Sequence, residues 1–349
     1  MARLRRVDCA APGITRRRRG RGFEYRDEEG ERIEDPEVVA RIRTLAIPPA
    51  WNDVWVCVYP MGHIQATGMD AAGRKQYRYH DQWRQRRDAE KFDEMIDFAR
   101  SLPRLRELVA RDLGRDGLGD QRILACATRL LDRGFFRVGS EGYAEDNETY
   151  GLATIRKQHV TVDGDTMVFD YAAKGKKRRI QRLIDPEVAG IVQTLKRRRS
   201  GGDELLAYRQ GRQWVDVKSA DVNAYLKHAA GGEFSAKDFR TWNATVLAAL
   251  ALAASGPAAS GSATARKRAQ KRAVDEVSRY LGNTPAVCRA SYIDPRVFDR
   301  FDGGLTIGGV FSELMAGEGG WPDIQPGIDQ GVLDLICEDE ESERVEKVA

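Results

Sequence analysis

Strand patterns and helix patterns occupy different parts of this chain of 349 residues. Apolar and polar residues alternate over residues 51–59, and strand patterns interrupted by glycine turns continue to residue 80. Residues 23–33 also resemble a hairpin, turning at Glu28-Glu29-Gly30. From residue 81 onward helical periodicity dominates. This distribution predicts an α+β protein, with a small β-rich amino-terminal domain and a larger, mainly α-helical domain that begins near residue 90.

Helix boundaries are marked by capping residues. Asp35-Pro36 predicts a helix start, and Gly134 predicts the end of a helix over residues 120–133. Ser235-Ala236-Lys237-Asp238 matches a capping box, so we expect a helix there with Lys237 and Arg240 on one face. A basic helix should end at Gly282. We expect a break at Pro103, a loop over 140–149 and a flexible loop over 253–265.

The clearest hairpin lies in the middle of the chain. Residues 159–162 and 167–171 alternate apolar and polar side chains around Asp163-Gly164-Asp165. The second strand leads into Lys174-Gly175-Lys176, which we expect at a hairpin tip or strand end. Lys174 therefore has a position from which a flexible segment could carry it toward a ligand.

Charge is distributed unevenly along the chain. The net charge is +4, but residues 313–349 hold 11 acidic and 2 basic side chains, leaving 55 basic and 42 acidic ones elsewhere. We expect a basic disordered arm over residues 1–21, domains over 22–90 and 91–302, and an acidic tail over 303–349. A basic body suggests a polyanionic partner, although a solvated surface would explain a charge surplus alone.

Cysteine and histidine residues are scattered. No two of the five cysteines or four histidines have metal-ligand spacing, so we expect neither a disulfide framework nor a metal site. We see no secretory leader, and the longest apolar run, residues 246–254, is far shorter than the about 20 residues that span a bilayer. These features predict a cytoplasmic protein with reduced thiols.

A tyrosine follows the predicted end of the basic helix. Tyr292 lies nine residues after Asn283 in Leu281-Gly282-Asn283. A phenol, with an ordinary pKa of about 10, attacks a phosphodiester only where cations and hydrogen-bond donors stabilise the developing charge. Arginine suits the non-bridging oxygens, and an acid must protonate the departing sugar oxygen. Arg137 and Arg240 are the candidates for the first role, and Lys174 for the second.

Each candidate also has an ordinary structural explanation. Arg137 could form an ion pair between helices, Lys174 could lie in a solvated loop, Asn283 could end a helix and Tyr292 could pack in the core. Considered singly, each of them is more often structural than catalytic. Their order along the chain, and the local pattern around each, favour the catalytic interpretation.

A basic hairpin precedes the long helical region. Cations alternate there with aromatic and amide side chains, a mixture suited to DNA because cations contact phosphates while Gln and Tyr reach bases or sugars. An exposed hairpin with packed tyrosines is an equally good explanation from the sequence alone. The candidate DNA contacts are Arg74, Lys75, Gln76, Tyr77 and Tyr79, together with Lys237.

The set of Arg137, Lys174, Lys237-x-x-Arg240, Leu281-Gly282-Asn283 and Tyr292 resembles the active site shared by tyrosine recombinases and type IB topoisomerases. Residues 62–80 and 136–150 resemble the short type IB DNA topoisomerases of bacteria and poxviruses. The resemblance covers about residues 20–300 and implies a catalytic domain of this kind, acting on duplex DNA as a monomeric clamp without ATP, metal or other cofactor.

The resemblance also assigns roles. Tyr292 would form a 3′-phosphotyrosyl link, Arg137 and Arg240 would stabilise the transition state, and Lys174 would be the general acid. Tyr143 would contact DNA. Asn283 stands where viral and eukaryotic members have His, and asparagine can donate only as a neutral group.

Two other functions remain open at this stage. A tyrosine recombinase would use the same chemistry on two synapsed duplexes. A non-catalytic architectural protein would bind DNA with salt-sensitive affinity and form no covalent adduct.

Overall fold

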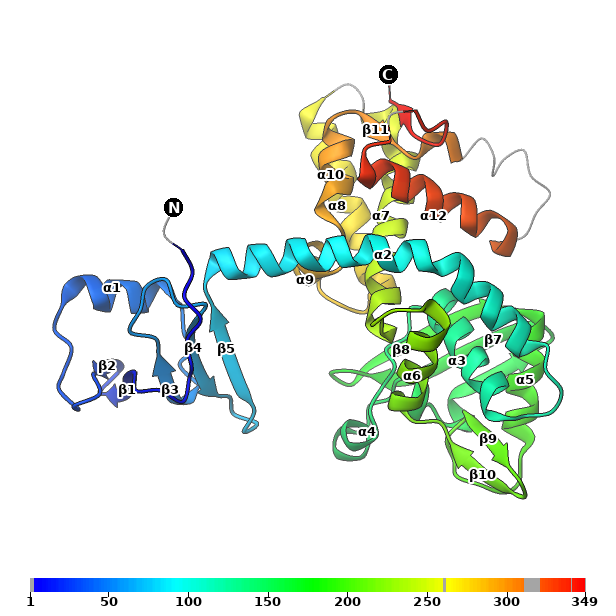
Figure 1. Ribbon diagram of the computed structural model, residues 1–349, viewed down its shortest axis with the longest axis horizontal. Helices are drawn as coiled ribbons and strands as arrows, with labels where there is room; N and C mark the ends of the chain where they lie inside the picture. The colour runs from blue at the N-terminus through cyan, green and yellow to red at the C-terminus, as the bar shows by residue number, and fades with distance from the viewer. Residues whose placement is uncertain (1–2, 260–261, 311–320, 340, 349) are drawn as a thin grey trace. The chain divides into compact units, whose positions relative to one another are not determined.

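The computed structural model describes residues 3–259, 262–310, 321–339 and 341–348 (Figure 1). The chain divides into two compact units, an amino-terminal unit, Met1–Phe92, and a carboxy-terminal unit, Asp93–Ala349. Helix α2 (Asp81–Leu113) contains the point of division. Each unit has its own hydrophobic core, so each is described separately.

The amino-terminal unit is built on one antiparallel sheet. Its strand order is β2-β1-β3-β4-β5. Helix α1 (Pro36–Thr44) begins at Asp35, whose Oδ1 accepts a hydrogen bond from the Glu37 backbone N at 2.8 Å, and contributes Ile42 to a small core. The strands are β1 (Ile14–Arg19), β2 (Gly22–Arg26), β3 (Asn52–Val56), β4 (Ile64–Met69) and β5 (Lys75–Tyr79).

The expected disordered arm over residues 1–21 is wrong for the part that forms β1. Strand β1 pairs with both β2 and β3, and Ile14 is buried. The Arg16 guanidinium donates to the carbonyls of Pro48 and Trp51 and lies 4.1 Å from the centre of the Phe23 ring. Pairing with distant strands therefore orders a basic block whose composition alone suggests disorder. The expected hairpin over 23–33 is present as a short antiparallel contact, in which the Ile33 backbone N donates to the Tyr25 carbonyl at 2.9 Å, while the longer pairing of β2 is with β1.

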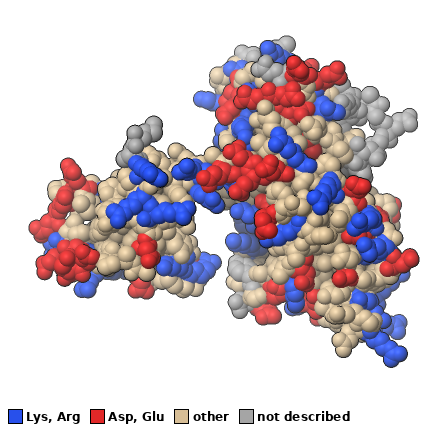
Figure 2. Space-filling model, viewed as in Figure 1, with Lys and Arg blue, Asp and Glu red and all other residues tan. Residues whose placement is uncertain are grey.

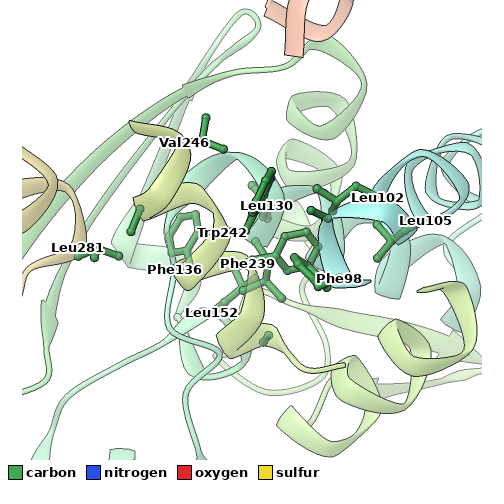
Figure 3. Packing of buried hydrophobic residues seen from close by; sticks show 14 of the residues in the cluster. Phe98, Leu102, Leu105, Leu130, Phe136, Leu152, Phe239, Trp242, Val246 and Leu281 are labelled. Carbon is green, nitrogen blue, oxygen red and sulfur yellow. The ribbon is translucent and has the colours of Figure 1, made fainter. Parts of the chain in front are cut away.

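The carboxy-terminal unit surrounds the antiparallel sheet β6-β7-β8 with helices. Its core is one continuous cluster in which Phe98, Phe136, Phe239 and Trp242 lie close together (Figure 3). A β-rich amino-terminal unit and a mainly helical carboxy-terminal unit together confirm the predicted α+β fold. The sheet and the helices near it are α3 (Asp120–Gly134), α4 (Glu141–Asn147), β6 (Val160–Asp163), β7 (Thr166–Ala173), β8 (Lys177–Ile184), α5 (Pro186–Arg197) and α6 (Ser219–Ala230).

The later elements carry the candidate nucleophile. Helices α7 and α8 are adjacent, and α9 and α10 follow α8 closely. Short elements complete this unit: η1 (Leu152–Thr154), η2 (Lys157–His159), β9 (Ala207–Gln210) and β10 (Gln213–Asp216). The helices are α7 (Ala236–Ala259), α8 (Ala263–Leu281), α9 (Pro285–Ser291) and α10 (Pro295–Asp302).

Three predicted interruptions are wrong. Helix α2 continues through Pro103, because the flanking Leu102 and Leu105 are fully buried and hold the helix by packing. The segment 253–265 was expected to be a flexible loop, but α7 extends to Ala259 and α8 begins at Ala263. Helix α4 occupies most of the expected loop 140–149. In each case tertiary packing or local capping outweighs a weak local propensity.

The expectation of an acidic tail over 303–349 needs correction too. Strand β11 (Leu305–Thr306) pairs with β12 (Glu346–Lys347), and α12 (Trp321–Cys337) packs against α7 and α10. Asp329 of α12 accepts hydrogen bonds from Trp242 Nε1 at 2.7 Å and Arg106 Nη1 at 2.5 Å. Arg106 also pairs with Asp132, which places this acidic segment within the core.

Acidic side chains form local groups on the visible surface. Figure 2 shows such groups along α2, at the end of the carboxy-terminal unit that holds the carboxy terminus and on the amino-terminal unit, with Lys and Arg scattered between them. The acidic side chains near the carboxy terminus thus lie on a folded surface and do not form a detached tail. No helix in the described ranges is long and apolar enough to cross a membrane.

Candidate active site

Arg137 lies in an extended segment directly after α3. The helix ends at Gly134, and Phe135 takes a left-handed conformation with φ of 54°, which is uncommon for a bulky residue. Phe136 is fully buried and anchors the segment, while the carbonyl of Arg137 accepts a hydrogen bond from the Leu152 backbone N at 2.8 Å. These contacts place the guanidinium of Arg137 half-buried at the edge of the core.

A close backbone contact holds the other end of this segment. Gly139 has a φ of +84°, and a Cβ on Gly151 would lie 2.5 Å from Gly139 Cα. Only glycine permits this approach, so the turn after Arg137 depends on both residues.

Arg240 is the most buried cation of the site, with 3% of its surface exposed. It lies in the first turns of α7, where the Ser235 backbone N donates to Asp238 Oδ2 at 2.7 Å. Its guanidinium donates to the carbonyl of Phe135 at 2.6 Å and to that of Leu281 at 2.9 Å. Arg240 therefore joins the end of α3 to the end of α8.

The end of α8 places Asn283. Gly282 adopts a left-handed conformation with φ of 65°, and the Asn283 backbone N donates to the carbonyl of Ser278, which is the pattern of a Schellman motif. The side chain of Asn283 then accepts a hydrogen bond from Arg137 Nη2 through its Oδ1. The predicted transition-state groups from three distant segments thus converge.

Tyr292 follows the short helix α9, which Thr284 caps and Pro285 opens. Its ring centre lies 5.5 Å from Arg240 Cζ, and its side chain is half-buried. Burial raises the pKa of Tyr292, but the positive charges of Arg240 and Arg137, together with the nearby donor groups of Asn283 and Arg240, lower it by more. The net result is a pKa below the ordinary value, which favours the phenolate.

The same environment also lowers the pKa of Arg240, and there the decrease disfavours the charged form. Burial, reinforced by the nearby charge of Arg137, lowers the pKa of Arg240 to about 10. It stays protonated at neutral pH, so two guanidinium charges face the tyrosine.

Two donors in this cluster have no protein acceptor. Arg240 Nε and Asn283 Nδ2 are buried, and neither has a hydrogen-bond partner among the described residues. Buried donors are usually paired, because an unpaired one costs about 1–3 kcal/mol. Their presence beside Tyr292 suits a ligand rich in acceptor oxygens, such as a phosphodiester.

Two hollows meet at these residues. The larger, of about 790 Å³, and the smaller, of about 370 Å³, share Arg137, Lys174 and Arg240 in their walls. Tyr292 and Lys237 line the smaller one, which we call the tyrosine groove; Asn283 lines the larger, which we call the strand groove. Lys174 is exposed in the β7–β8 turn, next to Gly175 with φ of +79°.

The candidate DNA contacts divide between the two faces of β5. Tyr77 and Tyr79 are exposed and stack with ring centres 5.9 Å apart, and Lys75 Nζ lies 5.9 Å from the Tyr77 ring. Gln76 is on the other face and donates to Asp70 Oδ2 at 2.9 Å, a carboxylate that also pairs with Arg74. The structure therefore presents the tyrosines together but not Gln76 beside them.

Two further residues complete the comparison with the sequence. The side chain of Tyr143 lies outside the described residues. Arg179, which lies in a basic run and has no role predicted from the sequence, lines the strand groove with its guanidinium against the end of α8. Its inward position follows the alternation of β8 and could have been found by counting from the Lys174 turn.

Comparisons with known proteins identify the family. Residues 80–301 match the family described as the eukaryotic DNA topoisomerase I catalytic core, and residues 22–70 match the bacterial DNA topoisomerase IB amino-terminal domain. DNA topoisomerase 1B of Acanthamoeba polyphaga mimivirus is 32% identical over 290 residues, covering 80% of this chain and 85% of that protein. The chain belongs to the type IB DNA topoisomerases.

More distant relatives match shorter stretches. DNA topoisomerase 1B of vaccinia virus (strain Copenhagen) is 26% identical over 109 residues, which cover 31% of this chain and 35% of that protein. DNA topoisomerase 1 of Daucus carota is 28% identical over 128 residues, or 36% of this chain and 15% of that protein.

Proposed function

We propose that Tyr292 is the nucleophile with which this DNA topoisomerase opens one strand of a duplex. The observation that supports this most is the position of Tyr292 beside two guanidinium groups that lower its pKa, with two unpaired donors next to it. Tyr292 also packs against the core, but core packing does not require two guanidinium groups beside the phenol.

The reaction exchanges one phosphodiester for another. The Tyr292 oxygen bonds to phosphorus as the bond from phosphorus to the 5′ oxygen breaks, leaving a 3′-phosphotyrosyl link and a 5′-hydroxyl. Lys174 gives its proton to the departing oxygen, and the phenol proton passes to solvent. Because the number of phosphoester bonds is unchanged, resealing needs no ATP.

The charge that builds on the non-bridging oxygens meets donors already in place. Arg137 and Arg240 supply guanidinium groups, and Asn283 supplies a neutral N–H from Nδ2. Preorganised donors of this kind are typically worth a factor of about 10²–10³ in rate each. Together they offer the positive field that a metal ion would otherwise provide, and we propose that the reaction proceeds without one.

The amino-terminal unit would hold the duplex while the cut strand rotates. We propose that Tyr77, Tyr79, Lys75 and Arg74 contact DNA there, and that Lys237 and Tyr143 do so from the carboxy-terminal unit. A single chain would act as a clamp on DNA in the cytoplasm, associated with the nucleoid. Torsional strain in the duplex would drive rotation until the 5′-hydroxyl attacks the phosphotyrosyl link.

Relaxation of supercoiled plasmid tests this proposal. With EDTA present and ATP omitted, the wild-type protein should relax plasmid DNA, and Tyr292→Phe should not. Tyr208→Phe is the matched control: Tyr208 is a partly buried tyrosine of the same unit that lines neither groove. Full activity of the Tyr292→Phe protein would refute the assignment of the nucleophile.

A further inference from the structure

Arg179 is a cation of the site to which neither the sequence nor the proposed mechanism assigns a role. It lies on β8, directly opposite Tyr171 of β7. Its neighbours Arg178 and Ile180 are exposed, whereas Arg179 is half-buried, and all three border the strand groove. The alternation of the strand thus directs one side chain of a basic run inward.

The guanidinium of Arg179 reaches the last turn of α8. Its Nη2 donates to the carbonyl of Tyr280, and its Nη1 lies so close to Gly282 that a Cβ there would be 2.8 Å away. Arg240 donates to the next carbonyl, that of Leu281, at 2.9 Å. Consecutive carbonyls at a helix end, which lack intrahelical donors, are therefore held by two arginines from different elements.

This contact has a consequence for Asn283. The Schellman turn at Gly282 determines where the Asn283 side chain points, and the two arginine contacts hold that turn from both sides. No carboxylate in the described ranges forms an ion pair with Arg179, whose polar partners are the Tyr280 carbonyl and the Tyr171 side chain. Partial burial without an anionic partner lowers the pKa of Arg179, so its charge is costly to retain for stability alone.

We propose that Arg179 is a positioning residue that aims Asn283 at the scissile phosphate. This inference rests on the proposed function, since it presumes that Asn283 contacts the transferring phosphate.

The test is a double-mutant cycle on covalent adduct formation. A duplex with a mapped cleavage site is mixed with excess protein, and the rate of adduct appearance is measured for single variants of both residues and for the double variant. We expect Arg179→Ala to slow the reaction about tenfold, as misplacement of a catalytic group does. Combined with Asn283→Ala, it should cause no further loss, because the group that it aims is already absent.

Two controls separate positioning from folding and from lost charge. Arg179→Lys keeps a cation that can donate to the Tyr280 carbonyl, so it should recover most of the rate and melt at the wild-type temperature. Arg212→Ala removes the same charge from an exposed hairpin and should leave the rate unchanged. Losses that multiply in the double variant, or a wild-type rate for Arg179→Ala, would overturn the proposal; an adduct formed by Tyr292→Phe would instead refute the proposed function.

Discussion

Replacement of Arg240 by glutamine separates the catalytic and structural roles of this side chain. The guanidinium holds the carbonyls of Phe135 and Leu281 and faces Tyr292. Glutamine carries no charge and can donate to one carbonyl at most, leaving the other buried without its donor. We expect the cleavage rate to fall by about 10²–10³-fold. The free energy of unfolding should fall by about 1–3 kcal/mol, well below the 5–15 kcal/mol typical of a folded domain.

The pH dependence gives this prediction its specific signature. Cleavage should accelerate as Tyr292 ionises, and in the wild-type protein that rise lies below the ordinary phenol pKa of about 10. Arg240 is the strongest of the positive charges that lower this pKa against the effect of burial. Without it the pKa of Tyr292 rises, so the rise in rate should move to higher pH.

Adduct formation on a mapped duplex, followed across neutral and alkaline pH, measures both effects. Arg212→Gln changes the same charge on an exposed hairpin and serves as the control. A wild-type rate for Arg240→Gln, or a pH profile that does not move, would refute the reasoning.

Substitutions at three other positions test the buried network, the neutral donor and the general acid. Asp329→Ala removes the acceptor of Trp242 Nε1 and one of the two carboxylates that pair with Arg106, so urea titration should show a loss of about 1–3 kcal/mol in the free energy of unfolding; a loss within error would contradict the buried network. Asn283→Ala should slow plasmid relaxation, whereas Asn283→His should retain activity and gain a pH dependence near neutrality from an imidazole of ordinary pKa about 6.5; equal rates for Asn283→Ala and wild type would remove the role of this side chain. Lys174→Ala should slow cleavage of normal DNA but not of DNA with sulfur as the leaving atom, since a thiol of pKa about 8.5 departs without a proton; equal defects on both substrates would exclude Lys174 as the acid.

Local chemistry explains the parts of the fold that the sequence predicts well. The Asp35 cap, the Ser235 capping box and the Gly282 stop each act within a few residues, and the structure has helix boundaries at these positions. The hairpin that ends at Lys174 likewise depends on alternation and a short turn. These signals need no knowledge of the rest of the molecule.

The failures arise where distant contacts decide the structure. The basic block at Arg16 becomes a strand because β3 offers an edge, and α2 passes Pro103 because buried leucines flank it. The acidic helix α12 is held by Asp329 in the core. Composition alone does not reveal which distant segments make these contacts.

The candidate site likewise combines residues that the sequence identifies with an arrangement that depends on distant contacts. The sequence proposes Arg137, Lys174, Arg240, Asn283 and Tyr292 through a resemblance, and their roles stay predictions until activity is measured. What the sequence could not provide is their mutual arrangement: the hydrogen bond from Arg137 to Asn283, the carbonyls held by Arg240, and the contact of Arg179 with the end of α8. These depend on which segments meet in the folded unit.

The most direct test of the central claim is to identify the residue and the DNA end that form the covalent link. Protein trapped on end-labelled duplex DNA is digested with protease, and the peptide that carries the nucleotide is sequenced by mass spectrometry. The account predicts a single peptide in which Tyr292 is joined to a 3′ phosphate, with a free 5′-hydroxyl on the other strand end. A nucleotide joined to any other residue, or to a 5′ phosphate, would contradict it.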